Sequence, residues 1–322
     1  MKLIRSVHQV AAALACVGLM SGAAVQAQSV SVSSIVEHPA LDAIKDGVHK
    51  ALTDAGYTEA SGFKWQFQTA QGNPAIAAQI ARKFVGDKAD VIVAISTPSA
   101  QAVVSATKTI PVVYSAVTDP VVAHLVPSMA PSGTNVTGVS DALALEAQVD
   151  LIKKVVPDAK RVGMVYNPGE ANSAVVVKEM KELLPKHGMT LVEATAPRTV
   201  DVGAAARSLV GKVDVIYTNT DNNVVSAYES LVKVGVDAKV PLIASDTDSV
   251  ARGAIAALGV NYYDLGLQTG QQVIRILKGE KPGDMASETS TKLELYVNPG
   301  AAKRQGVSLN EDFVKSATKI VE

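Results

Sequence analysis

The stretch "VIVAISTPSAQAVVSA", residues 91–106, changes character within one step of the chain. Its five leading apolar residues are typical of a buried strand, and the polar group Ser96-Thr97-Pro98-Ser99 follows them at once. An alanine-rich helical pattern then begins at Pro98, a residue that suits the first turn of a helix. Residues 214–225, "DVIYTNTDNNVV", repeat the change. The sequence therefore predicts two corresponding corners, each leading from a strand into a helix.

The same alternation of short apolar runs and helical patterns continues along the chain. The predicted strands are 30–36, 65–69, 91–95, 112–116, 161–166, 190–194, 213–218, 241–245 and 254–260. The predicted helices include 39–55, 74–85, 144–155, 171–187, 202–210, 223–234 and 262–277. This spacing favours right-handed βαβ units around parallel strands. Ala, Val, Ile and Leu supply most of the 48% hydrophobic content, as in sheets that are covered by helices on both faces.

A weak internal sequence repeat favours two lobes over one large sheet. Aligning Asp90-Val91-Ile92 with Asp214-Val215-Ile216 also brings "IPVVYSA" (110–116) beside "VPLIASD" (240–246). The predicted fold class is therefore α/β, with two similar, doubly wound parallel-sheet lobes joined by a multi-strand hinge. We expect the first lobe to contain residues 28–141 and about 261–285. The second lobe would then contain residues 142–260 and about 286–322.

The first 27 residues have the pattern of a signal peptide. Lys2 and Arg5 precede an apolar run, and Val25-Gln26-Ala27 places small residues where a signal peptidase cleaves. We expect a mature chain that starts near Gln28 and is released into the periplasm. An alternative is a lipid anchor on Cys16, because Ala13-Leu14-Ala15-Cys16 loosely resembles a lipobox.

The charge balance of the mature chain excludes several classes of partner. Removing Lys2 and Arg5 from the 30 basic residues leaves 28 against 31 acidic ones, a formal charge of −3. No basic block is present, so nucleic acid and anionic lipid are poor partners. Cys16 is the one cysteine of the sequence, so the mature chain must be stabilised by its hydrophobic core rather than by disulfides.

The first corner predicts an anion site. In open parallel sheets, ligands bind outside the carboxyl ends of the strands, where Ser96, Thr97 and Ser99 are placed. Ser96 or Thr97 could cap the helix that starts at Pro98, leaving free N–H groups for a carboxylate. Plain helix capping with no ligand is the competing interpretation.

Other strand ends add polar candidates of a different chemistry. Asp246 stands where the aligned first lobe has Ala116, so the lobe architecture does not require its charge. A buried carboxylate needs a partner, which a ligand ammonium would supply, although capping of the helix after residue 247 is the alternative. The remaining candidates also lie at strand ends or at the "YNPGEANSAV" corner (166–175): Glu37, His38, Asn167, Asn172, Ser173, Thr220 and Asp221.

Motifs for catalysis are missing from the sequence. It contains neither a Gly-x-Ser-x-Gly nucleophile elbow nor a phosphate loop that ends in Gly-Lys-Ser/Thr. Its histidines are scattered, with no spacing that suits a metal ion. We therefore expect no enzymatic activity, no metal and no cofactor.

A set of motifs across the mature chain resembles the ABC transporter substrate-binding family that includes the tryptophan- and tyrosine-uptake lipoproteins. The resemblance implies a type I periplasmic-binding-protein fold, a two-lobed clamp that closes on a small ligand and docks on a membrane permease. The corner 167–173 keeps the family's Asn-Pro-x-Glu-x-Asn-Ser pattern. Further matching segments are 38–42, 72–74, 94–100, 117–120, 135–140, 245–246, 253–254, 261–285 and 298–309.

The predicted function is capture of an amino acid between two lobes by a monomeric, exported solute-binding protein of an ABC importer. The Ser96–Ser99 corner would receive the ligand carboxylate, and Asp246 on the facing lobe would receive its ammonium. An aromatic amino acid is the specific expectation, and it comes from the family resemblance. A periplasmic sensor module that presents a solute to a signalling receptor is the alternative.

Overall fold

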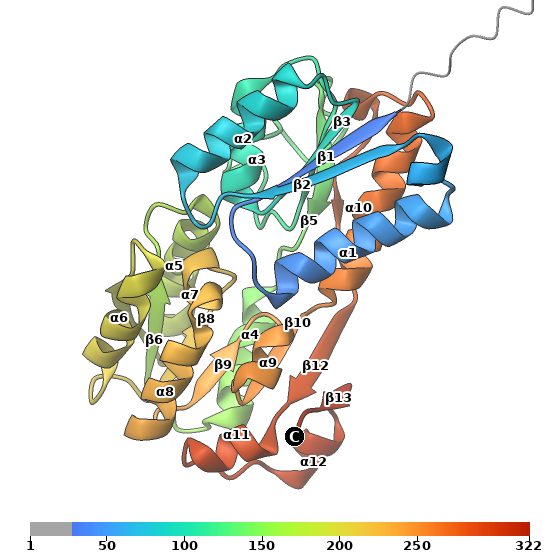
Figure 1. The fold of residues 1–322 in the computed structure, drawn as a ribbon. Helices are drawn as coiled ribbons and strands as arrows, with labels where there is room; N and C mark the ends of the chain where they lie inside the picture. Colours follow the sequence, from blue (N-terminus) through green and yellow to red (C-terminus); the bar gives the residue numbers. More distant parts are fainter. Residues whose placement is uncertain (1–27) are drawn as a thin grey trace, which may run out of the picture.

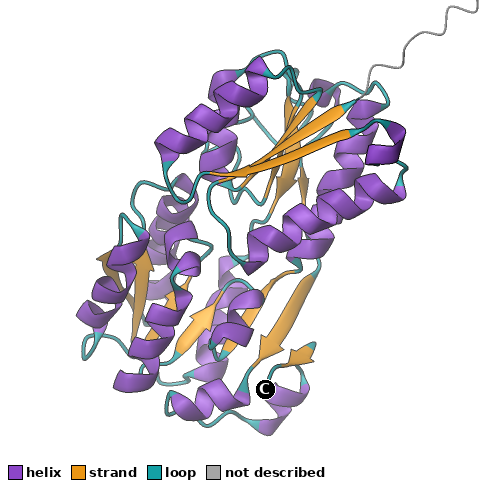
Figure 2. Cartoon of the chain, in the orientation of Figure 1, coloured by secondary structure: helices purple, strands orange, loops and turns teal. Residues whose placement is uncertain are grey.

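The computed structural model describes residues 28–322 and contains two α/β lobes, one above the other in Figure 1. Each lobe has one sheet with helices packed on both sides (Figure 2). The predicted fold class is confirmed, because both sheets consist mainly of parallel strands. The predicted signal peptide and Cys16 lie outside the described residues.

Lobe 1 is built on a six-stranded sheet with the order β11-β5-β4-β3-β1-β2, in which every pairing is parallel. Its strands are β1 (Ser29–Ser34), β2 (Lys64–Thr69), β3 (Val91–Ile95), β4 (Val112–Ser115), β5 (Val136–Ser140) and β11 (Glu288–Thr289). Its helices are α1 (Pro39–Asp54), α2 (Pro74–Gly86), α3 (Thr97–Ala106) and α10 (Tyr262–Leu277), with short 3₁₀ turns η1 (Glu59–Ser61) and η4 (Pro282–Asp284).

Lobe 2 has a seven-stranded sheet with the order β13-β12-β10-β9-β8-β6-β7, and β12 runs antiparallel to β10. Its strands are β6 (Arg161–Tyr166), β7 (Thr190–Thr195), β8 (Val215–Thr218), β9 (Leu242–Ala244), β10 (Ala256–Val260), β12 (Leu293–Val297) and β13 (Lys319–Ile320). Its helices are α4 (Leu145–Val155), α5 (Ala171–Leu183), α6 (Val202–Leu209), α7 (Asn222–Ser226), α8 (Tyr228–Ala238), α9 (Asp248–Arg252), α11 (Pro299–Arg304) and α12 (Glu311–Lys315), with η2 (Leu184–His187) and η3 (Thr199–Asp201).

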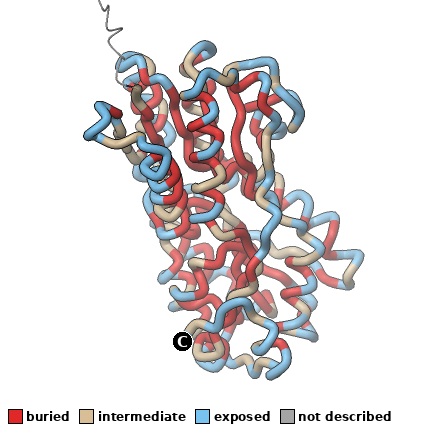
Figure 3. The backbone as a smooth tube through the Cα atoms, turned by 90° about the vertical axis from the view of Figure 1, so that its right-hand side faces the viewer, coloured by how far each residue is buried: buried red, intermediate tan, exposed pale blue. Residues whose placement is uncertain are grey.

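Each lobe has its hydrophobic core between its sheet and the helices that cover it. Buried backbone runs through the centre of both lobes, and exposed segments lie around the rim (Figure 3). The central strands of lobe 1 are buried along their whole length, as β3 shows, because helices cover both faces of the sheet. Lobe 2 has two separate apolar clusters. Within residues 28–322, no helix combines the length and the apolar character needed to cross a bilayer.

Helix starts in lobe 1 obey local capping rules. Pro39 and Pro74 each occupy the first helical position, where a missing N–H costs nothing. The Asn73 side chain accepts hydrogen bonds from two backbone N–H groups of α2, and Asn261 does the same for α10. These caps fix the points at which the chain turns from each strand end into the next helix.

Helices α1 and α10 pack unusually closely, and they lie side by side in Figure 1. Small residues make this approach possible. A Cβ atom added at Gly266 would lie 2.9 Å from the carbonyl carbon of Ile44, and one added at Gly47 would lie 2.9 Å from the backbone nitrogen of Leu267. Since a real Cβ does not come this near to backbone atoms, glycine is required at both positions.

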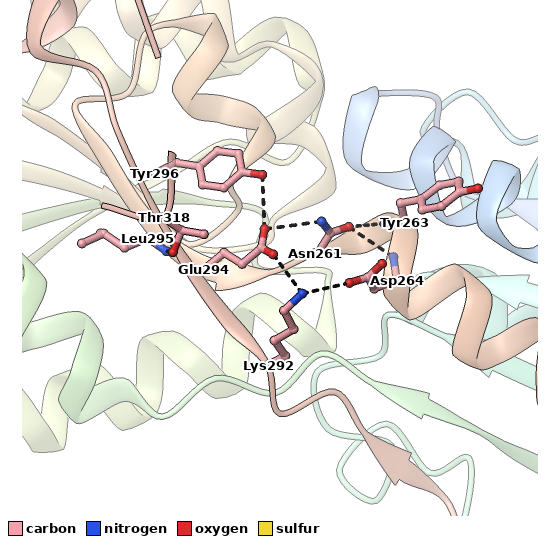
Figure 4. Close-up of polar contacts among 8 residues, drawn as sticks. All are labelled: Asn261, Tyr263, Asp264, Lys292, Glu294, Leu295, Tyr296 and Thr318. Atoms are coloured by element: carbon pink, nitrogen blue, oxygen red, sulfur yellow. Dashed lines mark hydrogen bonds and ion pairs between the residues drawn. The ribbon is translucent and has the colours of Figure 1, made fainter. Parts of the chain in front are cut away.

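The chain passes between the two sheets three times: after β5, between β10 and α10, and between β11 and β12. A polar cluster joins the last two crossings (Figure 4). Lys292 Nζ lies 3.4 Å from Asp264 Oδ2 of α10 and 3.3 Å from Glu294 Oε1 of β12. Glu294 Oε2 also accepts hydrogen bonds from Asn261 and Tyr296. The two crossings are therefore linked to each other by side chains as well as by the backbone.

Candidate ligand-binding cleft

A cavity with about 350 Å³ of unfilled space lies between the carboxyl ends of the strands of the two lobes. Lobe 1 contributes residues that follow β1, β3, β4 and β5, and lobe 2 contributes residues that follow β6, β8 and β9. Tyr262 follows β10 at the second crossing between the lobes. The lining consists of His38, Ala40, Leu41, Ser96, Thr97, Ala116, Thr118, Asp141, Asn172, Thr220, Asn222, Val225, Asp246 and Tyr262.

A second cavity of about 540 Å³ adjoins the first and shares Thr118, Asp141 and Thr220 with it. Thr118 Oγ1 of lobe 1 lies 3.5 Å from Thr220 Oγ1 of lobe 2. The lobes thus touch across the cleft.

The corner at Ser96 is the most unusual backbone feature of the cleft. Ser96 has φ 77° and ψ 158°, a region that is occupied almost only by glycine. Ala116, at the corresponding end of β4, also has a positive φ of 53°. Two non-glycine residues in strained conformations therefore line one cavity, and such strain persists only where the surrounding structure enforces it.

The prediction that a Ser96 or Thr97 side chain caps the helix at this corner is wrong. α3 begins at Thr97, and its N-cap residue Ser96 makes no side-chain hydrogen bond to the helix. The reason lies in the backbone, because a capping side chain normally reaches the helix N–H groups from an extended residue, which Ser96 is not. The hydroxyls of Ser96, Thr97 and Ser99 are all buried without a partner among the described residues. Of the three, Ser96 and Thr97 line the cavity, where a ligand can pair with their hydroxyls.

We expect Ser96→Gly to separate stability from binding. Glycine adopts this backbone conformation without strain, so the free energy of unfolding should rise by roughly 1–3 kcal/mol. Affinity for the ligand should fall at the same time, because the hydroxyl is lost. Chemical denaturation and calorimetric titration of the variant test both effects. Unchanged or reduced stability would show that the corner is not strained.

Asp246 lies at the cavity and also contacts the start of a helix. It lines the cavity and is buried, with only 1% of its surface exposed. Its two carboxylate oxygens accept hydrogen bonds from the backbone N–H and the hydroxyl of Ser249, each at 2.8 Å, so the carboxylate does hold the start of α9. Burial raises the pKa of Asp246, while the Ser249 bonds and the charge of Arg252 oppose that rise.

His38 lines the cavity on the lobe 1 side. Its Nδ1 accepts the backbone N–H of Leu41 at 3.4 Å and so caps α1. Burial, with a contribution from the Arg252 charge, lowers the pKa of His38 to about 3. The ring is therefore neutral, and with Nδ1 acting as an acceptor its proton is on Nε2. Glu37, the preceding residue, is exposed and does not line the cavity.

Three other predicted residues, the half-buried Asn167 and the buried Ser173 and Asp221, form a hydrogen-bonded cluster outside the cavity lining. Asp221 accepts hydrogen bonds from the Ser173 hydroxyl and the Asn167 backbone N–H, each at 2.6 Å, and caps α7 through Val224. None of the three is part of the cavity lining. Their hydrogen bonds join the segment after β6 to the segment after β8. They therefore hold in place the neighbouring residues that line the cavity.

Asn172 and Thr220, which are neighbours of this cluster in the sequence, are predicted site residues that do line the cavity. Asn172 Nδ2 donates to Glu170 and to the Thr220 carbonyl oxygen, which leaves Asn172 Oδ1 without a partner among the described residues. Burial and the neighbouring charge of Asp221 raise the pKa of Glu170 to about 7. Ser99 is buried beside the lining rather than in it.

Sequence reasoning missed several residues of the lining, above all Asp141, Thr118 and Tyr262. Asp141 directly follows β5, and Tyr262 is the first residue of α10. Both stand next to predicted crossings between the lobes. The position of these two residues at the crossings could have identified them, because the hinge closes the base of a cleft between two lobes and hinge residues therefore border it.

A cleft of this kind, between two parallel-sheet lobes joined by three crossings, defines a two-lobed solute-binding protein. The model of the ABC transporter substrate binding protein family matches residues 29–321. The chain belongs to this family, which binds solutes and does not catalyse reactions. Within residues 28–322, no group of three or more His, Cys, Asp or Glu side chains could hold a metal ion.

Named relatives share most of the chain. It is 42% identical over 289 residues to a tyrosine-binding protein of Clostridioides difficile, covering 89% of this chain and 84% of the relative. A conserved domain protein of Vibrio cholerae is 47% identical with a TM-score of 0.90, covering 92% of this chain and all of that one. An ABC domain from Streptococcus pneumoniae in complex with L-Trp is 32% identical with a TM-score of 0.88, and the coverage is again 92% and 100%.

A further similar structure superposes less closely on this chain. The ligand-free, open structure of the C. difficile substrate-binding protein CD0873 is 39% identical and covers 92% of this chain and 99% of that one, with a TM-score of 0.69. The L-Trp complex therefore superposes better on this chain although its sequence is less similar.

Proposed function

We propose that the protein is the periplasmic solute-binding component of an ABC importer, and that it captures an aromatic amino acid by closing its lobes. The observation that carries this proposal is the chemistry of the cavity. Unpartnered hydroxyls stand at one corner of lobe 1, and buried carboxylates stand elsewhere around the same space. An amino acid is the class of ligand that presents one carboxylate and one ammonium to such a site.

The ligand carboxylate binds at Ser96 and Thr97, where the hydroxyls and the positive end of the α3 dipole both favour an anion. The ammonium binds at Asp246 on lobe 2. One ligand thereby pairs with both lobes, and its differential affinity for the closed form drives closure. The aromatic side chain is supported by the tyrosine-binding relative and by the relative in complex with L-Trp.

Lobe closure is supported by the contrast in similarity to the two kinds of relative. This structure matches the L-Trp complex more closely than the open, ligand-free structure, despite the lower sequence identity to the former. The contact between Thr118 and Thr220 across the cleft agrees with a closed arrangement. After export and removal of the signal peptide, the closed protein would deliver its ligand to an ABC permease in the inner membrane.

We expect ligand binding to compact the purified mature protein. Mass spectrometry of the natively purified protein identifies the carried ligand, and small-angle scattering then compares the ligand-free protein with protein saturated with that compound. The radius of gyration should fall on binding, because the two lobes rotate together. Tight binding without compaction would contradict closure. A carried ligand that is not an amino acid would contradict the proposed ligand class.

A further inference from the structure

Asp141 is a buried carboxylate that faces the cavity and has no cation beside it. Its side chain accepts hydrogen bonds from the Thr118 hydroxyl at 3.2 Å and from the Tyr262 hydroxyl at 3.0 Å. Only 3% of the residue is exposed. No Lys, Arg or His side chain among residues 28–322 forms an ion pair with it, and both of its partners are neutral donors. A buried carboxylate without a cation is costly, and burial accordingly raises the pKa of Asp141. A cation from outside the chain would offset this cost and favour the ionised form.

Asp246 differs from Asp141 in this respect. The Arg252 charge favours the ionised form of Asp246 but makes no such contribution at Asp141. Arg252 itself is paired with Glu229 at 2.7 Å and donates to the carbonyl oxygen of Val225. Of the two carboxylates in the lining, Asp141 therefore has the greater electrostatic need for a bound cation.

The Asp141 and Asp246 carboxylates both affect the electrostatics around Tyr262. Both line the same cavity together with Tyr262, and the negative charges of both contribute to raising the pKa of the Tyr262 hydroxyl. A primary ammonium has three N–H donors, enough to bind two carboxylates and one further acceptor. The hydroxyls of Thr118 and Thr220, which lie in the same lining, provide acceptors of that kind.

We propose that Asp141 is a second ammonium-binding residue, which makes the site select primary amines more strongly than it selects carboxylates. This inference rests on the proposed function and specifies which group of the ligand dominates recognition. Asp141 follows β5 at the first crossing, and its bond to Tyr262 joins that crossing to the second one. An ammonium bound between Asp141 and Asp246 therefore links the hinge to lobe 2.

The test uses three probes that share one side chain: L-tyrosine, tyramine without the carboxylate, and 3-(4-hydroxyphenyl)propanoate without the ammonium. Calorimetric titration of the wild-type mature protein should show that losing the ammonium weakens binding more than losing the carboxylate. Asp141→Asn should weaken L-tyrosine and tyramine by about tenfold or more and leave the propanoate unchanged, because a buried charge pair is broken. The matched control is Asp90→Asn, which removes one carboxylate at the opposite end of β3 and should change none of the affinities.

A second variant separates charge from hydrogen bonding. Tyr262→Phe removes one donor to Asp141 but keeps the negative charge, so selectivity for amines should persist. The inference is overturned if Asp141→Asn binds L-tyrosine within threefold of the parent, or if it weakens all three probes alike. It is also overturned if Tyr262→Phe abolishes amine selectivity as fully as Asp141→Asn does. A wild-type protein that binds tyramine but not L-tyrosine would instead contradict the proposed amino-acid function while Asp141 keeps its role.

Discussion

Asp246→Ala is expected to weaken binding of the amino acid by roughly thirty-fold to several thousand-fold. The ligand ammonium would remain in a closed cleft without one of its counter-charges, and truncating one member of a buried pair costs about 2–5 kcal/mol. The measurement is calorimetric titration with the ligand identified by mass spectrometry. Affinity within about threefold of the parent, or roughly 0.7 kcal/mol, would contradict a role for Asp246 in binding the ammonium.

The control for this experiment must account for the bonds between Asp246 and Ser249. Alanine removes them, so the variant should also lose about 1 kcal/mol of stability at the start of α9. Asp246→Asn keeps a carbonyl oxygen that can accept the Ser249 N–H but has no charge. If loss of the cap alone weakened binding, Asp246→Asn would bind like the parent, whereas an electrostatic role predicts that both variants bind weakly.

Gly266→Ala is expected to destabilise the protein by about 3 kcal/mol, at the upper end of the usual cost of overpacking. The added methyl group would meet backbone atoms of Ile44 on α1, and backbone cannot rotate away as a flexible side chain can. Urea denaturation monitored by circular dichroism measures the change.

Gly86→Ala is the matched control for that substitution. Gly86 is the last residue of α2, and a Cβ added there has no atom within 4 Å. The same chemical change should therefore be neutral or stabilising by up to about 1 kcal/mol. If Gly266→Ala were as stable as Gly86→Ala, the close packing of α1 on α10 would not be a property of the folded protein.

The sequence predicted most elements because apolar runs and capping residues identify them locally. All nine predicted strands correspond to strands of the structure, and residues 262–277 were predicted as the helix that is observed. The sequence pattern predicts a crossing rather than a strand at β5, because Gly138 and its polar neighbours interrupt the apolar pattern of Val136–Ser140. Tertiary pairing with β4 is what makes that segment a strand. β11 and β13, with two residues each, are too short to produce any periodic signal.

Site residues were harder to predict, since a strand end limits position but not the direction in which a side chain faces. His38 and Glu37 are adjacent, yet the first lines the cavity and the second is exposed. Asp221 and Asp246 follow neighbouring strands, yet only Asp246 reaches the lining. Asp141 escaped prediction because its place in the lining depends on where the hinge borders the cleft, which is a property of the assembled lobes.

The position of α10 in the chain affects the order in which the protein can fold during synthesis. Leu265 and Val273 of α10 belong to the apolar core of lobe 1, but they are translated after β6, β7, β8, β9 and β10 of lobe 2. The nascent first lobe therefore lacks part of its core until most of the chain has left the ribosome, and domains whose parts are made last cannot fold early. A polypeptide with this arrangement is expected to complete its first lobe late, which would be compatible with the proposed export as an extended chain.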